Sequence, residues 1–450
     1  MERFVAGVGL LAIIGMAYAL SSHRRRVDWR LVFWGTALQF ILAVGVLKTD
    51  PGRMVFSFAN DAFKTVLGCS RDGASFVFGN LVDMNVPVGT SPTAGPNGGL
   101  TTAAGTWART GALFAFSVLP TVVFFSSLMA VGYHIGLMHR VVHALAWVMK
   151  RTLRTSGAES LSAAANIFVG QTEAPLLIRP YLDRMTRSEL LAVMVGGMST
   201  IAGGVLAAYV GMLSERFPDI AGHLIAASVM SAPASLVISK LLLPETEEPE
   251  TSGSLEVPNE RIDSNVIDAA TRGASEGLSL ALNIAAMLIA FISLVALGNV
   301  LWGLVCTGAA RVTGLDLTAI DTLQEVLGYL CAPLAWLMGV PMQDMVVAGQ
   351  FIGEKTVLNE FIGYAHMGDY LNGVPLPGGA PPQDLTERTK IILSYAMCGF
   401  ANFGSIGILV GGLSSLAPER RRDFAQLGVR ALIGGTLASF MTAAIAGMLL

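Results

Sequence analysis

The sequence predicts an all-α polytopic membrane protein with eight transmembrane helices, two oppositely oriented re-entrant hairpins and an inverted repeat. Three observations lead to this fold class. Only 14% of the 450 residues are charged and 53% are hydrophobic, whereas about 25% are charged in soluble domains. Long apolar runs recur along the whole chain, and two further apolar stretches are interrupted by polar residues and proline. This composition excludes ordinary soluble, disordered and disulfide-scaffold proteins.

A helix needs about 20 mostly apolar residues to cross ~30 Å of hydrocarbon. Eight segments meet this requirement, with the first two close to the short limit. They are Phe4–Leu20, Leu31–Leu47, Leu113–Ile135, Glu189–Leu213, Asp219–Leu243, Ala274–Val305, Arg388–Gly412 and Leu427–Leu449. Because no charged leader precedes the first segment, we interpret it as a retained helix and not as a cleaved signal.

Basic residues gather in four clusters, which the positive-inside rule places in the cytoplasm. They are Arg24–Arg26 with Arg30; Arg140, Lys150, Arg151 and Arg154; Arg179, Arg184 and Arg187; and Arg420–Arg422. The second and third clusters flank the apolar stretch Ala158–Ile178, so a single crossing there would put them on opposite sides. Polar residues and Pro175 also interrupt that stretch. We therefore expect a re-entrant hairpin that enters from the cytoplasm, where irregular backbone can line a protein cavity.

A second interrupted stretch, Leu323–Ile362, has Gly339-Val340-Pro341 at its centre. An even number of crossings here keeps Arg420–Arg422 inside, so it forms either two spans or a hairpin entering from outside. Its short polar breaks favour the hairpin. Both termini are then predicted outside.

Three connecting segments complete the topology. Thr49–Ala112 is expected on the outer surface, with an amphipathic helix at Arg53–Leu67 and a Gly/Pro-rich stretch at Pro87–Gly105. Leu137–Leu153 is expected to be an interfacial helix on the inside. Pro244–Ser264 reads as an acidic cytoplasmic loop.

The order hairpin, span, loop, span occurs from residue 158 and again from residue 323, in opposite orientations. Such inverted repeats are common in secondary transporters, whose sites lie at the midplane between repeats. Spans four and seven carry small and polar residues at mid-depth, at Gly196–Gly204 and Gly399–Ser405. Glycine permits unwinding of a helix and close backbone approach, so both spans are predicted to be broken.

Carboxylates at membrane depth are costly and therefore functional candidates. Glu173 and Glu360 lie in the two hairpins. Thr172 is expected to cap the second half of the first hairpin, with Pro175 in its first turn. Asn402 and Ser405 share one face of span seven. These neutral donors and two acids suit an uncharged, polyhydroxylated solute with a heterocyclic edge; the alternative is that they only satisfy broken helices.

Asn166 and Thr200 offer oxygens near broken backbone, which weakly indicates a monovalent cation site, with helix capping as the equal alternative. Other motifs carry less. His139 and His143 suit lipid headgroups better than a metal, and Gly349–Thr356 fails as a P-loop. Glu354-Lys355 is interpreted as a local ion pair and Lys240 as a snorkelling residue. Neither a nucleophile nor a metal set supports an enzyme, and the net charge of −3 gives no attraction to nucleic acid.

Several motifs resemble those of the concentrative nucleoside transporters, in their short bacterial form. They are Gly170–Pro175, Asn359-Glu360-Phe361, Ser394–Asn402, Ser228–Ser235 and the end of the chain from Arg430 onward. The resemblance covers essentially the whole chain and recurs in both repeats. It implies a homotrimer in the inner (plasma) membrane, in contact with lipid. It also implies a scaffold of spans one, two, three and six, and a moving transport domain built from the hairpins with spans four, five, seven and eight.

The corresponding boundaries are 1–157 for scaffold helices with interfacial helices and 158–243 for the first half of the transport domain. Residues 244–305 hold the loop and scaffold span six, and 306–450 the second transport half. The resemblance further implies that Gln171, Thr172 and Glu173 meet the nucleobase, with Val205 and Phe400 against its face. Glu360, Asn402 and Ser405 would hold the ribose hydroxyls. Na⁺ would bind the side chains of Asn166 and Thr200 and the carbonyls of Asn166, Val169 and Ile201.

These observations together predict a Na⁺-coupled symporter that imports nucleosides such as uridine, cytidine or adenosine by elevator-like alternating access, with no cofactor besides Na⁺ as coupling ion. Family members differ at the position of Ser199 and Thr200, and some use protons. H⁺ symport, with Glu360 or Glu173 titrating, is therefore the alternative. The rival from another class is a channel for small polar solutes, although inverted broken repeats argue against a continuous path, and a membrane enzyme is third.

Overall fold

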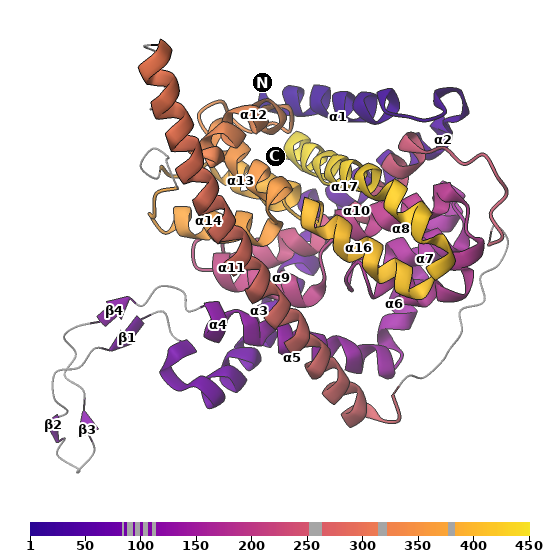
Figure 1. Ribbon diagram of the computed structural model, residues 1–450. Coiled ribbons are helices and arrows are strands. Elements are labelled where there is room, and N and C mark those ends of the chain that lie inside the picture. Colours follow the sequence, from indigo (N-terminus) through magenta and orange to yellow (C-terminus); the bar gives the residue numbers. More distant parts are fainter. Residues whose placement is uncertain are drawn as a thin grey trace.

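The structure, a computed structural model, describes residues 1–82, four short strands within 85–109, and residues 114–251, 263–313, 322–376 and 383–450. It is a helical bundle (Figure 1). The helices of its first half are α1 (Glu2–Ala19), α2 (Trp29–Lys48), α3 (Asp50–Phe78), α4 (Phe114–Ser117), α5 (Leu119–His134), α6 (Leu137–Leu153), α7 (Gly157–Ala165), α8 (Arg187–Ser199), α9 (Gly203–Leu213) and α10 (Ile220–Leu242). Those of the second half are α11 (Val266–Thr313), α12 (Leu323–Leu337), α13 (Met345–Val357), α14 (Glu360–Leu371), α15 (Glu387–Ala396), α16 (Phe403–Leu416) and α17 (Arg421–Leu449).

The remaining elements are short, apart from one long 3₁₀ helix. The 3₁₀ helices are η1 (Arg24–Arg26), η2 (Gly79–Val82), η3 (Ala174–Arg184) and η4 (Pro418–Arg420). Strand β1 (Asn85–Pro87) pairs with β4 (Trp107–Arg109), and β2 (Thr93–Ala94) pairs with β3 (Leu100–Thr101), both antiparallel. These strands lie apart from the helices (Figure 1). β2 and β3 fall in the predicted Gly/Pro-rich stretch, most of which is outside the described residues, and β1 and β4 flank it.

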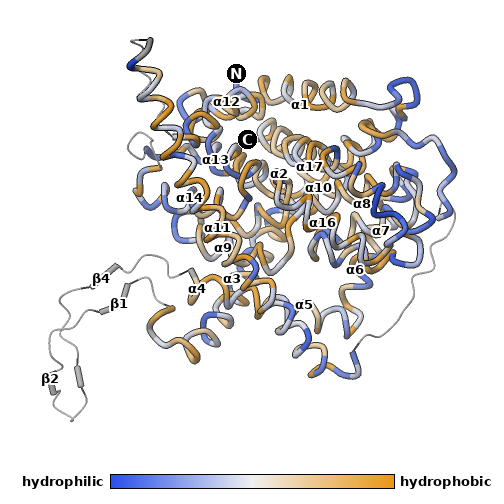
Figure 2. The backbone as a smooth tube through the Cα atoms, in the orientation of Figure 1, coloured by the Kyte–Doolittle hydropathy of each residue, from blue (hydrophilic) through white to orange (hydrophobic). Residues whose placement is uncertain are grey.

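Among the described residues, six helical segments are long and apolar enough to cross a membrane. They coincide with predicted spans one, two, four, five, six and eight. In Figure 2, hydrophobic residues are concentrated in the helices. The third predicted span is shorter than expected, because α5 begins at Leu119, and Leu113 lies outside the described residues. The next helix, α6, has the predicted bounds and is bent 78° from α5 at Ile135–Gly136.

The longest helix, α11, has 48 residues and begins well before predicted span six. Its polar first turns are anchored by Arg272, whose guanidinium donates two hydrogen bonds to Asp263 at 2.6 and 2.9 Å. It packs along α5 (Figure 1). The predicted amphipathic helix Arg53–Leu67 is likewise part of a longer helix, α3.

Predicted spans four and seven are both broken at the predicted glycine and polar runs. Thr200–Ala202 separates α8 from α9, and Met397–Asn402 separates α15 from α16. The two breaks contact each other, because the Phe400 N–H donates to the Thr200 carbonyl at 3.3 Å. Gly399 has φ +154°, and a Cβ there would lie 2.8 Å from the Met198 carbonyl oxygen. Only glycine therefore allows the two breaks to meet this closely.

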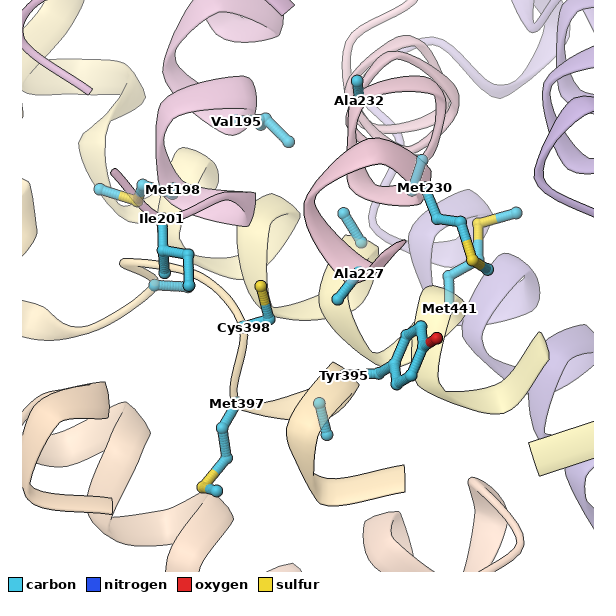
Figure 3. Packing of buried hydrophobic residues seen from close by; sticks show 14 of the residues in the cluster. Val195, Met198, Ile201, Ala227, Met230, Ala232, Tyr395, Met397, Cys398 and Met441 are labelled. Carbon is cyan, nitrogen blue, oxygen red and sulfur yellow. The ribbon is translucent and has the colours of Figure 1, made fainter. Parts of the chain in front are cut away.

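The crossing is packed in an apolar core. Met198 and Ile201 lie on one side of Cys398, with Met230, Tyr395 and Met441 on the other (Figure 3). The Ser439 hydroxyl donates to the Cys398 carbonyl at 3.1 Å and so ties the second break to α17. Tight packing of this kind restricts where the broken backbone can move.

The second interrupted stretch differs in detail from the expectation. Gly339, with φ +90°, forms the turn between α12 and α13. A further break at Leu358–Asn359 separates α13 from α14, and Glu360 begins α14. The Asn359 side chain accepts from the Ile362 N–H at 2.9 Å and caps this helix. Glu360 therefore follows the break at Leu358–Asn359 and not the turn at Gly339-Val340-Pro341.

The two termini lie at one end of the bundle, where the Arg3 guanidinium donates to the Leu450 carbonyl. Arg24–Arg26 follow the end of α1, and Arg420–Arg422 lie at the start of α17. Both clusters therefore lie at the ends of these helices that are far from the chain termini. There Arg420 donates to the Met185 carbonyl at 2.7 Å, beside Arg187. Three of the four basic clusters therefore share one end of the bundle and the termini share the other, as the predicted topology requires.

Candidate functional site

The first interrupted segment places an unpaired oxygen at its tip. Ser156 and Glu159 form a capping box that starts α7, and α7 ends where its alanine run gives way to Asn166. The Asn166 side chain is fully buried. Its Nδ2 donates to the Ser162 carbonyl at 3.0 Å, while its Oδ1 has no hydrogen-bond partner among the described residues. A buried acceptor without a partner costs about 1–3 kcal/mol, so it calls for a ligand.

Further main-chain oxygens are open next to Asn166. No main-chain N–H of the described residues donates to the carbonyls of Asn166, Val169 or Ile201. The Thr200 hydroxyl donates to the Gly196 carbonyl at 3.0 Å, so its own lone pairs stay available. The Gly203 N–H donates to the Phe168 carbonyl at 3.0 Å and holds the tip against the first break. Neutral oxygens in this arrangement fit a hard monovalent cation such as Na⁺.

The residues that follow the tip form a second polar group. Gln171 is buried, and its Oε1 has no hydrogen-bond partner among the described residues. Its Cα and Cβ pack against Gly197 in α8, where a Cβ would lie 2.8 Å from the Gln171 Cβ. The predicted cap by Thr172 is wrong: its hydroxyl donates to the Glu173 carboxylate at 3.0 Å, and Glu173 itself occupies the N-cap position of η3. Pro175 lies in the first turn of η3, as predicted.

The two carboxylates differ in environment. Glu173 is exposed, whereas Glu360 is buried. Glu360 accepts hydrogen bonds on both carboxylate oxygens, from the Tyr209 hydroxyl on Oε1 and from the Asn402 Nδ2 on Oε2, each at 2.9 Å. An ionised buried carboxylate needs partners of this kind. Glu360 is therefore held by two side chains, whereas the exposed Glu173 carboxylate accepts from Thr172.

Asn402 serves both the site and the fold. Its Oδ1 accepts from the Ser405 N–H at 2.8 Å and caps α16, while its Nδ2 reaches Glu360. The capping alternative and the binding prediction are thus compatible for this residue. Phe400 is half-buried at the same break, and Val205 is buried one turn after the first break. The structure brings Glu360, Asn402 and Ser405 together. The Phe400–Thr200 hydrogen bond links them to the oxygens of Asn166, Val169, Thr200 and Ile201, which we call the cation group.

Two interpretations of lysines are wrong. Lys240 does not snorkel: it is buried, and its Nζ lies 2.8 Å from the Glu159 carboxylate and 3.2 Å from Glu245. Lys355 does not pair with its neighbour Glu354, whose carboxylate contacts His366 Nδ1 at 2.8 Å. The Lys355 Nζ is buried without a hydrogen-bond partner among the described residues.

Sequence reasoning missed Tyr209, which lies within a helix of ordinary pattern, while its partner Glu360 is on another element. No signal in the sequence marks Tyr209. Among the described residues, no group of three His, Cys, Asp or Glu side chains could hold a metal ion.

Two broken helices that cross at a buried polar site define the class of secondary transporters. The chain matches the model of the Na⁺-dependent nucleoside transporter C-terminus over residues 223–447 and that of its N-terminus over residues 8–81. A model described as nucleoside recognition matches residues 115–216. The chain therefore belongs to the Na⁺-dependent nucleoside transporter family.

Relatives of two lengths are similar to the chain. An uncharacterised transporter of Haemophilus influenzae is 43% identical, with 98% of this chain and 96% of the relative covered. Solute carrier family 28 member 3 of Rattus norvegicus is 41% identical over 100% of this chain but only 59% of the relative. The chain thus spans about three fifths of the length of such animal relatives. Among solved structures, CNTnw in an inward-facing substrate-bound state has a TM-score of 0.83 and 42% identity, with 100% of this chain and 98% of that chain covered.

Proposed function

We propose that this protein is a symporter that imports nucleosides together with Na⁺ by elevator-like alternating access. The single observation that carries the proposal is the contact between the two breaks, in which the Phe400 N–H donates to the Thr200 carbonyl. This bond joins the neutral oxygens that fit a cation to the polar residues that fit a solute. Coupling needs such a link, because each ligand must change the affinity for the other.

The cation takes the unpaired Oδ1 of Asn166, the Thr200 hydroxyl and the open carbonyls of Asn166, Val169 and Ile201. Its binding orders the tip of the first hairpin, and this tip includes Gln171. Cation binding therefore prepares the nucleobase group of Gln171, Thr172 and Glu173. Without the cation, the tip loses this order and the solute binds weakly.

The solute is held at both ends. Gln171, Thr172 and Glu173 offer amide, hydroxyl and carboxylate groups to the nucleobase, and Val205 and Phe400 lie against its face. Glu360, Asn402 and Ser405 hold the ribose hydroxyls. The Glu360 carboxylate can accept hydrogen bonds from the hydroxyl groups of a neutral solute. The same negative charge would repel a solute that carries a phosphate or a carboxylate. The substrate class is therefore the uncharged nucleosides, including uridine, cytidine and adenosine.

The moving part comprises residues 158–243 and 306–450, which include α8 to α10 and α12 to α17 and hold both ligand groups. Residues 1–157 and 244–305 form the scaffold, which stays with the lipid. The exposed apolar surface of α11 fits contact with lipid or with neighbouring copies in a homotrimer. Both termini face outward across an inner membrane, with the basic clusters in the cytoplasm.

Uptake of radiolabelled uridine into proteoliposomes tests the proposal. The vesicles receive an imposed Na⁺ gradient, an imposed H⁺ gradient, or neither. Accumulation above equilibrium with the Na⁺ gradient alone is the expected result. Accumulation with the H⁺ gradient alone would replace Na⁺ by a proton. Equilibration without accumulation under either gradient would indicate a channel, and no uptake of uridine, cytidine or adenosine would refute nucleoside transport.

A further inference from the structure

The side chain of Glu360 is held by a residue outside the predicted site. Its Oε2 accepts from Asn402, which the sequence identified, and its Oε1 accepts from the Tyr209 hydroxyl at 2.9 Å. Tyr209 belongs to α9, one helical turn after Val205, so both residues lie on the same face of that helix. The helix that carries a base-facing residue therefore also holds the acid at the other end of the site.

The orientation of Tyr209 is fixed by packing. Its side chain is 0% exposed. Its ring stacks on that of Tyr364 with centroids 4.3 Å apart, and it makes a T-shaped contact with the Phe361 ring, with centroids 5.4 Å apart. The Tyr364 hydroxyl donates to the Ser394 carbonyl at 2.9 Å and not to Glu360. The one polar atom of the Tyr209 side chain is bonded to Glu360, so Tyr209 acts on binding through that carboxylate.

The hydrogen-bonding capacity of Glu360 then becomes informative. A carboxylate has about four acceptor positions, two on each oxygen. Tyr209 and Asn402 fill one position on each oxygen. Acceptor capacity remains beyond these two bonds, and it suits the hydroxyl groups of a ribose.

We propose that Tyr209 is a positioning residue that holds Glu360 for a vicinal diol, so that preference for ribonucleosides over deoxynucleosides depends on a hydroxyl outside the binding site. This inference rests on the proposed nucleoside transport. Without the Tyr209 hydroxyl, Glu360 keeps only the hydrogen bond from Asn402 and is free to turn away from the diol.

The test replaces Tyr209 in the full-length protein and measures uptake kinetics in proteoliposomes. Tyr209→Phe keeps the ring stack and removes the donor. For uridine, we expect KM to rise about tenfold, the loss that corresponds to about 1.4 kcal/mol, with the maximal rate within about twofold of wild type. For 2′-deoxyuridine and 3′-deoxyuridine, KM should change much less. The preference for uridine over both therefore falls.

Tyr364→Phe is the matched control, because it removes the hydroxyl of the other ring in the stack, which bonds only to main chain. It should leave the preference for uridine unchanged. In a Glu360→Gln background, Tyr209→Phe should add less than about twofold to KM, since residues acting through one another are not additive. Should Tyr209→Phe fail to accumulate, 4-fluorophenylalanine at position 209 fills the tyrosine's volume without a donor and takes its place.

The outcomes separate the two proposals. If wild type transports uridine but the variant keeps the wild-type preference over deoxyuridines, Tyr209 does not position Glu360 and only this inference fails. The same conclusion follows if Tyr364→Phe changes the preference equally, or if the effects of Tyr209→Phe and Glu360→Gln simply add. If wild type transports none of the three compounds, the proposed function fails and this inference fails with it.

Discussion

Asn402 makes two hydrogen bonds that substitution can separate. Its Nδ2 donates to Glu360 at 2.9 Å, and its Oδ1 accepts from the Ser405 N–H at 2.8 Å to cap α16. Serine is about as good an N-cap as asparagine, but alanine is not. Asn402→Ser therefore keeps the cap and loses the longer reach to Glu360, whereas Asn402→Ala loses both.

The expected magnitudes follow from these bonds. A hydrogen bond to a charged group contributes about 1.5–3 kcal/mol, so both variants should raise KM for uridine by about 10- to 150-fold. Loss of the cap costs a further 0.5–2 kcal/mol, roughly, in stability. Only Asn402→Ala should therefore unfold at a measurably lower temperature than wild type.

Uridine uptake in proteoliposomes and thermal unfolding of the purified protein in detergent measure the two effects. Tyr364→Phe, which leaves both bonds of Asn402 in place, serves as the control for general damage. The reasoning is refuted if Asn402→Ser retains the wild-type KM, because the bond to Glu360 would then contribute nothing. Equal unfolding temperatures for the serine and alanine variants would refute the capping role.

Three further predictions concern the cation group, a buried ion pair and a pH-dependent anchor. Asn166→Ala should raise the Na⁺ concentration needed for half-maximal uptake on the order of tenfold, with little effect at saturating Na⁺; an unchanged Na⁺ dependence would exclude Asn166 as a ligand. Lys240→Met leaves the Glu159 carboxylate buried and unpaired, which should lower the free energy of unfolding by about 3–5 kcal/mol, measured by SDS-induced unfolding. Adding Glu159→Gln should recover most of this loss, and no recovery would contradict a direct pairing of Lys240 with Glu159. The hydrogen bonds from Arg272 lower the pKa of Asp263, so their contribution to stability is present above the ordinary value of about 3.9 and is lost as the pH falls through the lowered pKa. Asp263→Asn should accordingly lower the unfolding temperature at neutral pH but not in strong acid, and an equal difference at both would exclude this ion pair as its cause.

Much of the fold could be predicted because a membrane imposes length and composition on each crossing. The apolar runs located six of the spans, and the glycine and polar runs located both broken helices. The extents of α3 and α11 could not be predicted, since polar turns such as those around Arg272 remain helical through contacts that apolar patterning does not report. The bend between α5 and α6 depends on Gly136, whose φ of +78° is visible only in the structure.

The candidate site was predictable where a residue is unusual for its surroundings. Glu360 and Asn402 are polar residues in apolar segments, and the structure brings them into contact. Tyr209 was not predictable, because tyrosine is common in such helices and its partner lies 151 residues away in the sequence. Lys240 was misinterpreted for a related reason: a lysine near a helix end usually reaches toward water, and only the packing of α7 against α10 shows that Glu159 receives it.

The contact between Arg3 and Leu450 brings the first and last residues of the chain close together. A short linker could join Leu450 to Met1, and new ends could be opened in the polar segment between Glu245 and Ser264. A circularly permuted chain of this kind would begin with α11 and end with α10, so the second half of the helices would be synthesised before the first. Uptake by that permutant would establish that the two halves fold without a fixed order of synthesis.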